Sequence, residues 1–597
     1  MRTLPPDVGG RSPDPQPDEQ PSLDQRRDTD RSNATRYLCV GAQIDGAFAD
    51  RVIREVLEQP YRAVAPSFGL NMVPIVVHAL NGRSRRKRRD ILLVVLALCA
   101  FIVSPITATV TALGWLWIRL IYRIARQQWP SWHRRHALYL VAVASVMIVP
   151  ILALTTFLLS LLVGLLRPYV ENIPLILAWP MYLGFWLPSP VAVLFIVMSL
   201  GLAWLILVWD RLSTRRVLID TLRPEAFSSG ILPFVHDYHP RLHDRFHLLQ
   251  KAQAGSNLTV YSSYSPFLGS GDERQTWGLT IDLSRGARHS DGEVKEPRPF
   301  SITKLHRHVR RRLAALGDPR LPHAQRISNL MIEDRLFVSG GAVHRDPRLL
   351  PQRDAPPVAQ VSARVMREYI NNPSGPVRHF KCVRVDSWDR EISFSGFLHL
   401  AVDGRTLYVE LTVCVLLPIK PDYHLIDTLT RSLLPGERGA MLWETFKDVP
   451  ASLLRAPVEL FGYWRSRYRE QRQDRVLQKM LYERLPIDYG ARVSVRELGE
   501  ATRYRNYFQA LDWYRQLRVI QPEILSAILD FLEEHHIDTS EFRERQSAIL
   551  NNGVVMLGSN IYNSTIAAGP GSSAVATTER PGTTGAGPAR STPKEKS

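Results

Sequence analysis

The apolar block from 91 to 209 limits what this chain can fold into more than any other feature. It follows the run Arg83–Arg89, in which six of seven residues are basic. A membrane-spanning helix needs about 20 apolar residues, because each residue advances about 1.5 Å across a hydrocarbon core of about 30 Å. The block therefore predicts an α-helical transmembrane region over 91–210 with about four spans.

Prolines divide this block into its expected crossings. They occur at Pro105, at Pro150 and in the sequence Pro188-Ser189-Pro190. The spans are expected near 91–118, 137–166, 174–188 and 190–209. Two alternatives stay open for 91–122, which either crosses once or turns back at Pro105 as a hairpin.

Charges at the two ends of the block predict its orientation. The Arg83–Arg89 run lies before it, and Arg211, Arg215 and Arg216 follow it. An even number of spans places both ends on one side, and basic residues favour the cytoplasmic side. We therefore predict a multi-pass protein of the bacterial inner (cell) membrane whose N- and C-terminal regions are both cytoplasmic.

The remaining sequence predicts a cytosolic α/β (α+β) domain with an antiparallel sheet, followed by a helical C-terminal part. Both chain ends hold too little apolar material to offset the entropy of ordering. The expected organisation is a disordered tail (1–34), a small cytosolic segment ending in the basic run (35–90), the transmembrane region (91–210), the α/β domain (211–430), a helical region (431–550), a short β-prone Asn/Gly motif (551–569) and a disordered tail (570–597).

The clearest elements are three successive strands over 379–388, 391–402 and 405–417. Apolar and polar residues alternate along the third, as on an antiparallel sheet with one buried face. Asp403-Gly404 between the last two predicts a tight hairpin. Helical spacing is expected over 302–316 and 361–370, and Tyr37–Val40 predicts a short strand.

Histidines between His236 and His247 are the only candidate metal ligands. His243 and His247 lie one helical turn apart, so one helix face would present both to a metal ion. The segment lacks the glutamate of a zincin motif. The ordinary interpretation, a polar segment beside the membrane, is favoured over a membrane-tethered enzyme or metal-binding protein that uses this region.

No catalytic or cofactor motif is present. The sequence Gly269-Ser270-Gly271 lacks the Lys and Ser/Thr that a phosphate-binding loop needs at fixed spacing, so it predicts an ordinary turn. No GxSxG elbow occurs. We therefore predict no catalytic residue and no cofactor, and the sequence favours a non-enzymatic protein over an enzyme.

The net charge of +18 predicts contact with anionic lipid headgroups. Each Lys or Arg near such a surface contributes about 1 kcal/mol of attraction. The residues expected at the lipid surface are Arg85, Arg86, Lys87, Arg88, Arg89, Arg310, Arg311 and Arg312. Nucleic-acid binding is not expected, because the arginines are spread over many segments rather than gathered in one stripe.

The sequence is compatible with three functions: a membrane anchor for an interaction domain, a membrane-tethered enzyme or metal-binding protein, and a transporter or channel subunit. The span interiors carry hydroxyls but few ionisable groups, which favours an anchor over a transporter or channel subunit. The leading hypothesis is an integral membrane protein that anchors a cytosolic interaction or regulatory domain for an unknown protein partner. The uncharged segment 551–569 adds possible self-association by β-stacking, with packing on its own domain as the alternative.

Two stretches resemble a known group of proteins. They are the segments Thr35–Cys39 with Arg62–Gly69, and Gly255–Tyr261 with Tyr264–Gly271. Both are similar to uncharacterised multi-pass membrane proteins of Streptomyces-type actinobacteria, over about 35–569. The resemblance implies a source and a membrane topology but no activity and no functional residues.

Overall fold

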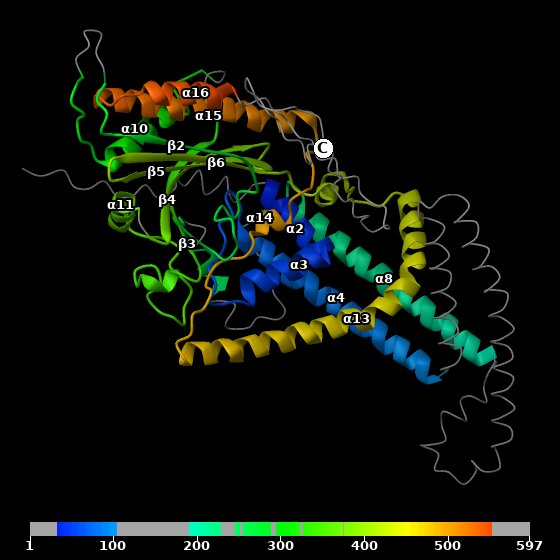
Figure 1. Ribbon diagram of the computed structural model, residues 1–597. Coiled ribbons are helices and arrows are strands. Elements are labelled where there is room, and N and C mark those ends of the chain that lie inside the picture. Colours follow the sequence, from blue (N-terminus) through cyan, green and yellow to red (C-terminus); the bar gives the residue numbers. More distant parts are fainter. Residues whose placement is uncertain are drawn as a thin grey trace, which may run out of the picture.

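The computed structural model describes residues 33–103, 190–227, 245–246, 248–250, 255–287, 294–322, 326–373 and 375–551. Figure 1 shows three parts: a sheet with its covering helices, a helical N-terminal piece, and three long helices that extend away from both. The predicted tail 570–597 and most of the tail 1–34 lie outside the described residues, as does all but the first residue of 551–569.

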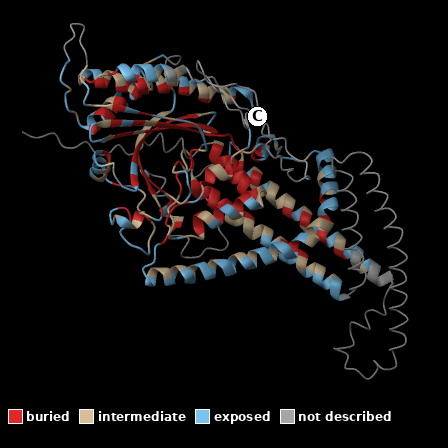
Figure 2. Ribbon diagram, viewed as in Figure 1, coloured by how far each residue is buried: buried red, intermediate tan, exposed pale blue. Residues whose placement is uncertain are grey.

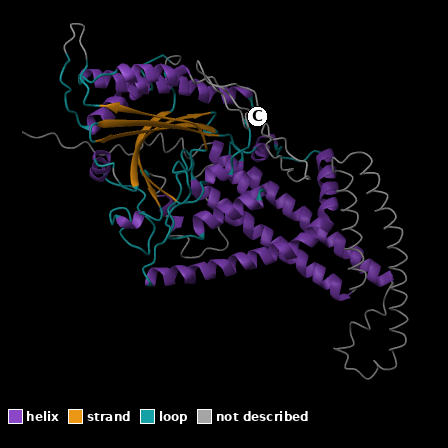
Figure 3. Ribbon diagram, viewed as in Figure 1, coloured by secondary structure: helices purple, strands orange, loops and turns teal. Residues whose placement is uncertain are grey.

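A six-stranded sheet forms the centre of the first part (Figure 3). Its spatial order is β1-β3-β4-β5-β6-β2. The strands are β1 (Leu258–Tyr261), β2 (Asp272–Asp282), β3 (Leu330–Ser339), β4 (Val377–Ser387), β5 (Ile392–Asp403) and β6 (Thr406–Leu416). The pair β1–β3 is parallel, whereas the other neighbours are antiparallel. The sheet is therefore mixed, and the prediction of an antiparallel sheet is corrected at the β1 edge.

Strands β4, β5 and β6 form the predicted meander. The β5–β6 register pairs Asp403 with Thr406, so the two connecting residues are Gly404 and Arg405 rather than Asp403 and Gly404. Gly404 has φ +58°, a value that favours glycine and suits the turn of a tight hairpin. Local alternation and turn chemistry were sufficient to locate these three strands.

One face of the sheet packs against four helices. These are α10 (Ile302–Ala315), α11 (Ala363–Asn371), α15 (Tyr507–Glu534) and α16 (Ser540–Asn551). Alternate strand residues such as Val383 and Val413 meet apolar residues of these helices, including Leu305 and Ile524. The predicted helices over 302–316 and 361–370 are present as α10 and α11.

The opposite face receives the N-terminal piece. The ring of Phe68 lies between two buried guanidinium groups of the sheet, 4.8 Å from Arg335 and 4.2 Å from Arg384. Aromatic faces attract cations in this way, more strongly when water is excluded. The segment around Phe68 is thereby attached to the centre of the sheet.

The N-terminal piece is helical. It contains α2 (Asn33–Ile44), α3 (Gly46–Val52), η1 (Ile53–Leu57) and the first turns of α4 (Met72–Val103), with their own core. Tyr37–Val40 belongs to α2, so the predicted strand is wrong. Helical spacing lets Leu38 face the core, and a Cβ on Gly41 would lie 2.3 Å from the ring of Tyr423. That close approach favours a helix packed tightly on the segment after β6.

Three long helices make up the third part, which we call the stem: α4, α8 (Pro190–Leu222) and α13 (Pro435–Tyr482). Figure 1 shows α4 and α8 running side by side while α13 crosses them and changes direction. Pro450 and Pro457 lie inside α13, and each removes one helical hydrogen bond, which is a common cause of a kink.

The prediction of about four spans is wrong for the part of the chain that the structure describes. There, one helical stretch, Val197–Leu222, is long and apolar enough to cross a membrane by length and composition. The multi-pass inner-membrane assignment loses its support accordingly. The expected spans 137–166 and 174–188 lie outside the described residues.

The first expected span, 91–118, is described only as far as 103, and its described part belongs to a longer helix. The helix that holds its apolar residues begins at Met72, and its first turns belong to the core of the N-terminal piece. The Arg83–Arg89 run therefore lies in the middle of a continuous helix, α4. The last expected span, 190–209, is also only part of a longer helix, α8.

Candidate functional site

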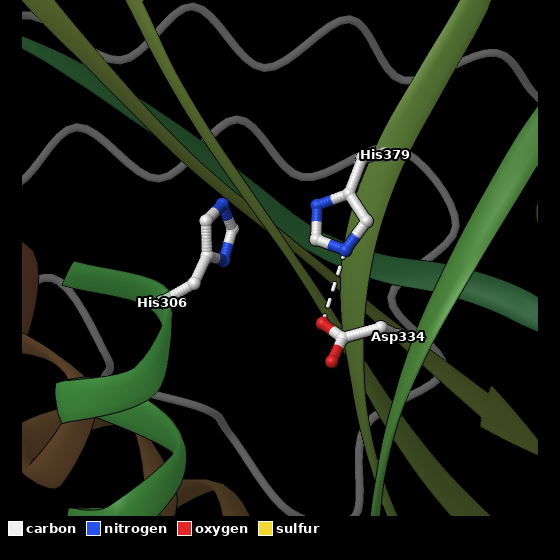
Figure 4. A group of neighbouring side chains, drawn as sticks. All are labelled: His306, Asp334 and His379. Carbon is white, nitrogen blue, oxygen red and sulfur yellow. Dashed lines mark hydrogen bonds and ion pairs between the residues drawn. The ribbon is translucent and has the colours of Figure 1, made fainter. Parts of the chain in front are cut away.

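A buried polar cluster lies between α10 and the sheet (Figure 4). Asp334 on β3 pairs in register with Lys381 on β4, and His379 precedes Lys381 by two residues on the same face. Asp334 Oδ1 accepts hydrogen bonds from Lys381 Nζ at 2.6 Å and from His379 Nε2 at 3.0 Å. His306 of α10 lies edge-on to His379, with ring centroids 4.7 Å apart.

The charges of this cluster balance internally. Burial raises the pKa of the Asp334 carboxyl, but the His379 hydrogen bond and the Lys381 ammonium outweigh it and hold that pKa well below its usual range. Burial lowers the pKa of His379 and of His306, which favours neutral rings. The cluster thus contains one carboxylate and one ammonium in direct contact.

The arrangement has the spacing of a metal site but not the right charge. One ligand atom each from His306, Asp334 and His379 fall within 4.8 Å of one another. A dication there would share Asp334 Oδ1 with the ammonium of Lys381, whose side chain is 1% exposed. Buried like charges repel strongly, and the ammonium already compensates the carboxylate. These residues therefore do not fit a resident metal, and the cluster instead joins β3, β4 and α10.

The predicted metal ligands His243 and His247 lie outside the described residues. Arg245 between them is described, and its buried guanidinium donates hydrogen bonds to three backbone carbonyls of the N-terminal piece: Val56 at 2.8 Å, Pro60 at 3.0 Å and Arg62 at 3.1 Å. Burial lowers the pKa of Arg245 to about 10. Arg245 therefore attaches this segment to the N-terminal piece.

The turn at Gly269-Ser270-Gly271 binds a carboxylate of the protein itself. Gly269 and Gly271 have φ +89° and +80°, and their N–H groups donate to Glu497 Oε1 at 2.6 and 3.3 Å. Successive N–H groups in such a turn form a concave site for an anion. Glu497 fills that position, so the turn is structural, as its sequence predicted.

A second cluster marks the point where the stem changes from polar to apolar. Arg89 on α4 contacts Asp90 at 2.8 Å and Asp210 of α8 at 3.2 Å, and Arg85 contacts Asp210 at 3.3 Å. Asp90 is 1% exposed and Asp210 8%. Two arginines and two aspartates therefore neutralise one another where α4 and α8 meet.

Helix α13 crosses the pair directly beside that cluster. A small core joins Leu93 of α4, Ala203 and Leu207 of α8, and Val449 and Ala456 of α13. Leu93 is three residues beyond Asp90, and Leu207 is three residues before Asp210. The crossing therefore lies at the boundary between the charged and the apolar segments of α4 and α8.

The stem exposes apolar side chains, and the outer end of α4 and much of α13 are pale blue in Figure 2. On α4 and α8 these are Ile91, Leu92, Val95, Leu98, Phe101, Ile102, Leu194, Val197, Met198, Leu202, Leu205 and Trp209. On α13 they include the aromatic residues Trp443, Phe446, Phe461, Trp464 and Tyr468. Exposed apolar surface of this extent usually marks a contact with a membrane or another protein.

The predicted lipid-contact residues on α4 fall into two groups. Arg85 and Arg89 are paired with carboxylates, as described above. Arg86 is half-buried and donates to the Gln43 carbonyl at 3.3 Å, whereas Lys87 and Arg88 are exposed. Sequence alone could not separate the two groups, because Asp210 is distant in the chain.

The predicted lipid-contact residues on α10 lie far from the stem, in the helical layer over the sheet. Arg312 contacts Glu523 of α15 at 2.8 Å and Asp530 at 3.2 Å. Arg310 is 3.8 Å from Asp334, and Arg311 is exposed. This run therefore serves in part to pair α10 with α15.

The aromatic stripe on α13 was not among the predicted sites. Its sequence signal is the mixing of Trp and Tyr with Arg over 453–468, for example at Trp464 and Arg465. Such mixing is typical of helices that lie in the membrane interface. Only the structure shows that this helix crosses the stem at the polar boundary.

Comparison with known proteins yields one similarity. Residues 276–563 match the family model described as the AbeC-like domain. No curated protein and no solved structure matches the chain at a significant level. The match brings neither an organism nor a membrane topology, so the expected resemblance to actinobacterial multi-pass proteins stays a prediction. From within β2 through α16, including the sheet meander and α13, the chain is therefore similar to the AbeC-like domain.

Proposed function

We propose that the chain is a membrane-anchored protein whose stem holds an interaction or regulatory domain beside an anionic bilayer. In this proposal the apolar segments of α4 and α8 enter the bilayer, that is, the residues after Asp90 on α4 and before Asp210 on α8. The sheet and its helices stay in water, where they would bind a protein partner. The activity of that domain is non-enzymatic in this proposal.

The observation that carries the proposal is the level at which α13 crosses the stem. A helix lying along a membrane surface should meet spanning helices where their charged residues end. Here α13 packs on Leu93 of α4, three residues after Asp90, and on Ala203 and Leu207 of α8, seven and three residues before Asp210. The exposed aromatic residues of α13 would then lie at the headgroup level.

The exposed apolar area supports insertion energetically. Twelve apolar side chains of α4 and α8 are each roughly half exposed. Burying half of such a side chain contributes about 1 kcal/mol, so transfer of the set into lipid would contribute on the order of 10 kcal/mol. In water this surface would instead promote aggregation.

A native thiol allows a direct test. Cys99 is exposed on the apolar segment of α4, whereas Cys39, Cys382 and Cys414 are buried. An environment-sensitive fluorophore attached to Cys99 in proteoliposomes should be quenched by lipids that carry a nitroxide on the acyl chain. It should be little affected by iodide in the aqueous phase.

The matched control places the same fluorophore on the sheet. In a Cys99→Ser background, Asp403→Cys puts the label next to the β5–β6 turn, where position 403 is exposed. That label should respond to iodide and not to the lipid nitroxide. Equal iodide quenching at the two positions would refute the proposed insertion.

A further inference from the structure

A groove of about 460 Å³ lies between α8 and the start of α13. Pockets for small ligands usually have volumes of about 300–1,000 Å³. One wall comes from Val208–Ile219 of α8, and the other from Arg431–Leu442, which includes the first turns of α13. The groove begins beside Asp210, so it lies on the polar side of the boundary described above.

The lining of the groove has two chemical halves. Four arginines contribute the cationic half: Arg215, Arg216, Arg431 and Arg438. The other half is apolar and includes Leu212, Leu433 and Met441. No Asp or Glu is among the described residues that line it. A ligand that satisfies both halves must carry a negative group and an apolar portion.

Two of these arginines are held in place by backbone carbonyls, which do not neutralise their positive charge. Arg215 Nη2 donates to the Thr430 carbonyl at 2.7 Å, and Arg438 Nε donates to the Leu433 carbonyl at 3.0 Å. Each guanidinium has five N–H donors, so several remain available for a ligand. The acid nearest in sequence, Glu437, caps the backbone N–H of Leu434 instead.

The other two arginines are exposed, and no ion pair joins them to any residue in the described ranges. This distinguishes them from stem arginines such as Arg89 and Arg211, which contact Asp210 and Asp448. Arg85, Arg89 and Arg211 are compensated by carboxylates of the stem in this way, whereas Lys87 and Arg88 are exposed, as the groove arginines are. In the groove, the charge complement must come from outside.

We infer that the groove binds one anionic phospholipid. Its phosphate would accept hydrogen bonds from Arg216 and Arg431, for which guanidinium geometry is well suited. Its glycerol and upper acyl chain would cover Leu212 and Met441. This inference rests on the proposed membrane anchoring, since the groove reaches the headgroup level only if α4 and α8 insert.

The test measures lipid selectivity with the full chain in phosphatidylcholine bilayers. Trace spin-labelled phosphatidylglycerol or phosphatidylcholine reports the fraction of lipid immobilised by the protein. We expect phosphatidylglycerol to be preferred, and Arg216→Gln with Arg431→Gln to weaken that preference by roughly fivefold per lost arginine. An unchanged preference in this double variant would overturn the inference.

The control removes the same charge elsewhere. Arg364 on α11 and Arg515 on α15 are exposed on the helical layer of the sheet domain. Arg364→Gln with Arg515→Gln should leave the lipid preference unchanged. If this control weakens the preference equally, net charge rather than the groove determines selectivity, and the inference fails.

Two further measurements separate the remaining outcomes. Failure of the Cys99 label to contact lipid in the unmodified chain would refute the anchoring itself, whereas a lipid-embedded label with no effect of the groove variants would refute only the groove. Inorganic phosphate at about 10 mM, roughly ten times the Kd of a weak millimolar site, should not displace the spin-labelled lipid. Full displacement would show that the groove binds phosphate alone, and it would refute the phospholipid inference. Leu212→Gln should weaken the lipid preference, because the inference requires the apolar wall to contact the lipid.

Discussion

Replacing Asp334 by Asn tests the central polar cluster most directly. The substitution keeps the shape of the side chain but removes its charge. Lys381, whose side chain is 1% exposed, would lose the carboxylate that lies 2.6 Å from its ammonium. The new amide oxygen can still accept one hydrogen bond, but it cannot balance a buried positive charge.

The expected loss follows from the burial of the two partners. Removing one partner of a buried ion pair destabilises a protein by about 3–5 kcal/mol. The Asp334 side chain is 25% exposed, so water reaches one edge of the cluster, and the lower value applies. At about 2–4 °C per kcal/mol for a domain of this size, we expect Tm to fall by roughly 6–12 °C.

Thermal unfolding of the full chain in lipid nanodiscs, followed by circular dichroism, gives this shift. Hydrogen exchange in peptides from β3 and β4 shows whether the change is local to the cluster. Lys381→Met should be milder, because Asp334 keeps its hydrogen bond from His379 and its partial contact with water. The double variant should therefore be nearly as stable as Lys381→Met alone.

Two results would refute this reasoning. A Tm change below about 2 °C for Asp334→Asn would mean that the ion pair contributes little to stability. Additive losses in the double variant would mean that Asp334 and Lys381 act independently, since directly coupled residues give non-additive effects. Addition or chelation of Zn²⁺ should leave the Tm unchanged in the unmodified chain, because Lys381 occupies the position that a metal would need.

Three further predictions concern the N-terminal piece and the stem. Burial lowers the pKa of His78 to about 4, from a value near 6.5 in the unfolded chain. The free energy of unfolding should therefore fall by roughly 3 kcal/mol as the pH drops from 6.5 to 4. His78→Leu should flatten the curve of Tm against pH in that range. Gly269→Ala places a Cβ 2.3 Å from the backbone oxygen of Pro66, at φ +89°. It should lower the free energy of unfolding by about 2 kcal/mol or more and speed proteolysis of the N-terminal piece. Gly341→Ala is the control: its Cβ meets open space, so stability should not change. Ala456→Leu overfills the stem core and should lower its stability by about 1–3 kcal/mol. Val458→Leu, at an exposed position of the same helix, should not. Equal effects of the two variants on thermal unfolding would contradict the packing of α13 on α4 and α8.

The meander shows which features local sequence can determine. Alternation along β6 and the glycine of the β5–β6 turn act between neighbouring residues, so they are visible without the fold. The parallel β1–β3 pair joins residues 78 positions apart, Leu258–Tyr261 and Leu336–Ser339. Such pairing depends on how the whole chain packs, so no local sequence pattern predicts it.

The polar cluster left a partial signal in the sequence. His379 and Lys381 occupy alternate positions on a strand whose next residues on that face are apolar, Val383 and Val385. A charged residue on an apolar face requires a buried partner. The identity of that partner, Asp334, follows only from the register of β3 against β4.

The basic run shows the opposite case. The sequence located the charged and apolar stretches correctly, but the inference that all these charges face lipid was wrong for Arg85 and Arg89. Hydropathy identifies an apolar stretch after Arg89, but it cannot show that the helix had begun 17 residues earlier, at Met72. Nor can it show that Arg85 and Arg89 meet Asp210 from another helix. A charge near an apolar segment attracts lipid only if the protein has not already neutralised it.

The sequence by itself determined local elements such as the β4–β6 meander: where apolar and polar residues alternate, and where a turn needs glycine. These properties depend on side-chain chemistry over a few neighbouring residues. The tertiary structure decided which charges are paired inside the protein and which remain free, as in the α8–α13 groove, and it placed α13 across the polar boundary of the stem. Those outcomes depend on contacts between residues hundreds of positions apart, because burial and pairing are properties of the packed chain.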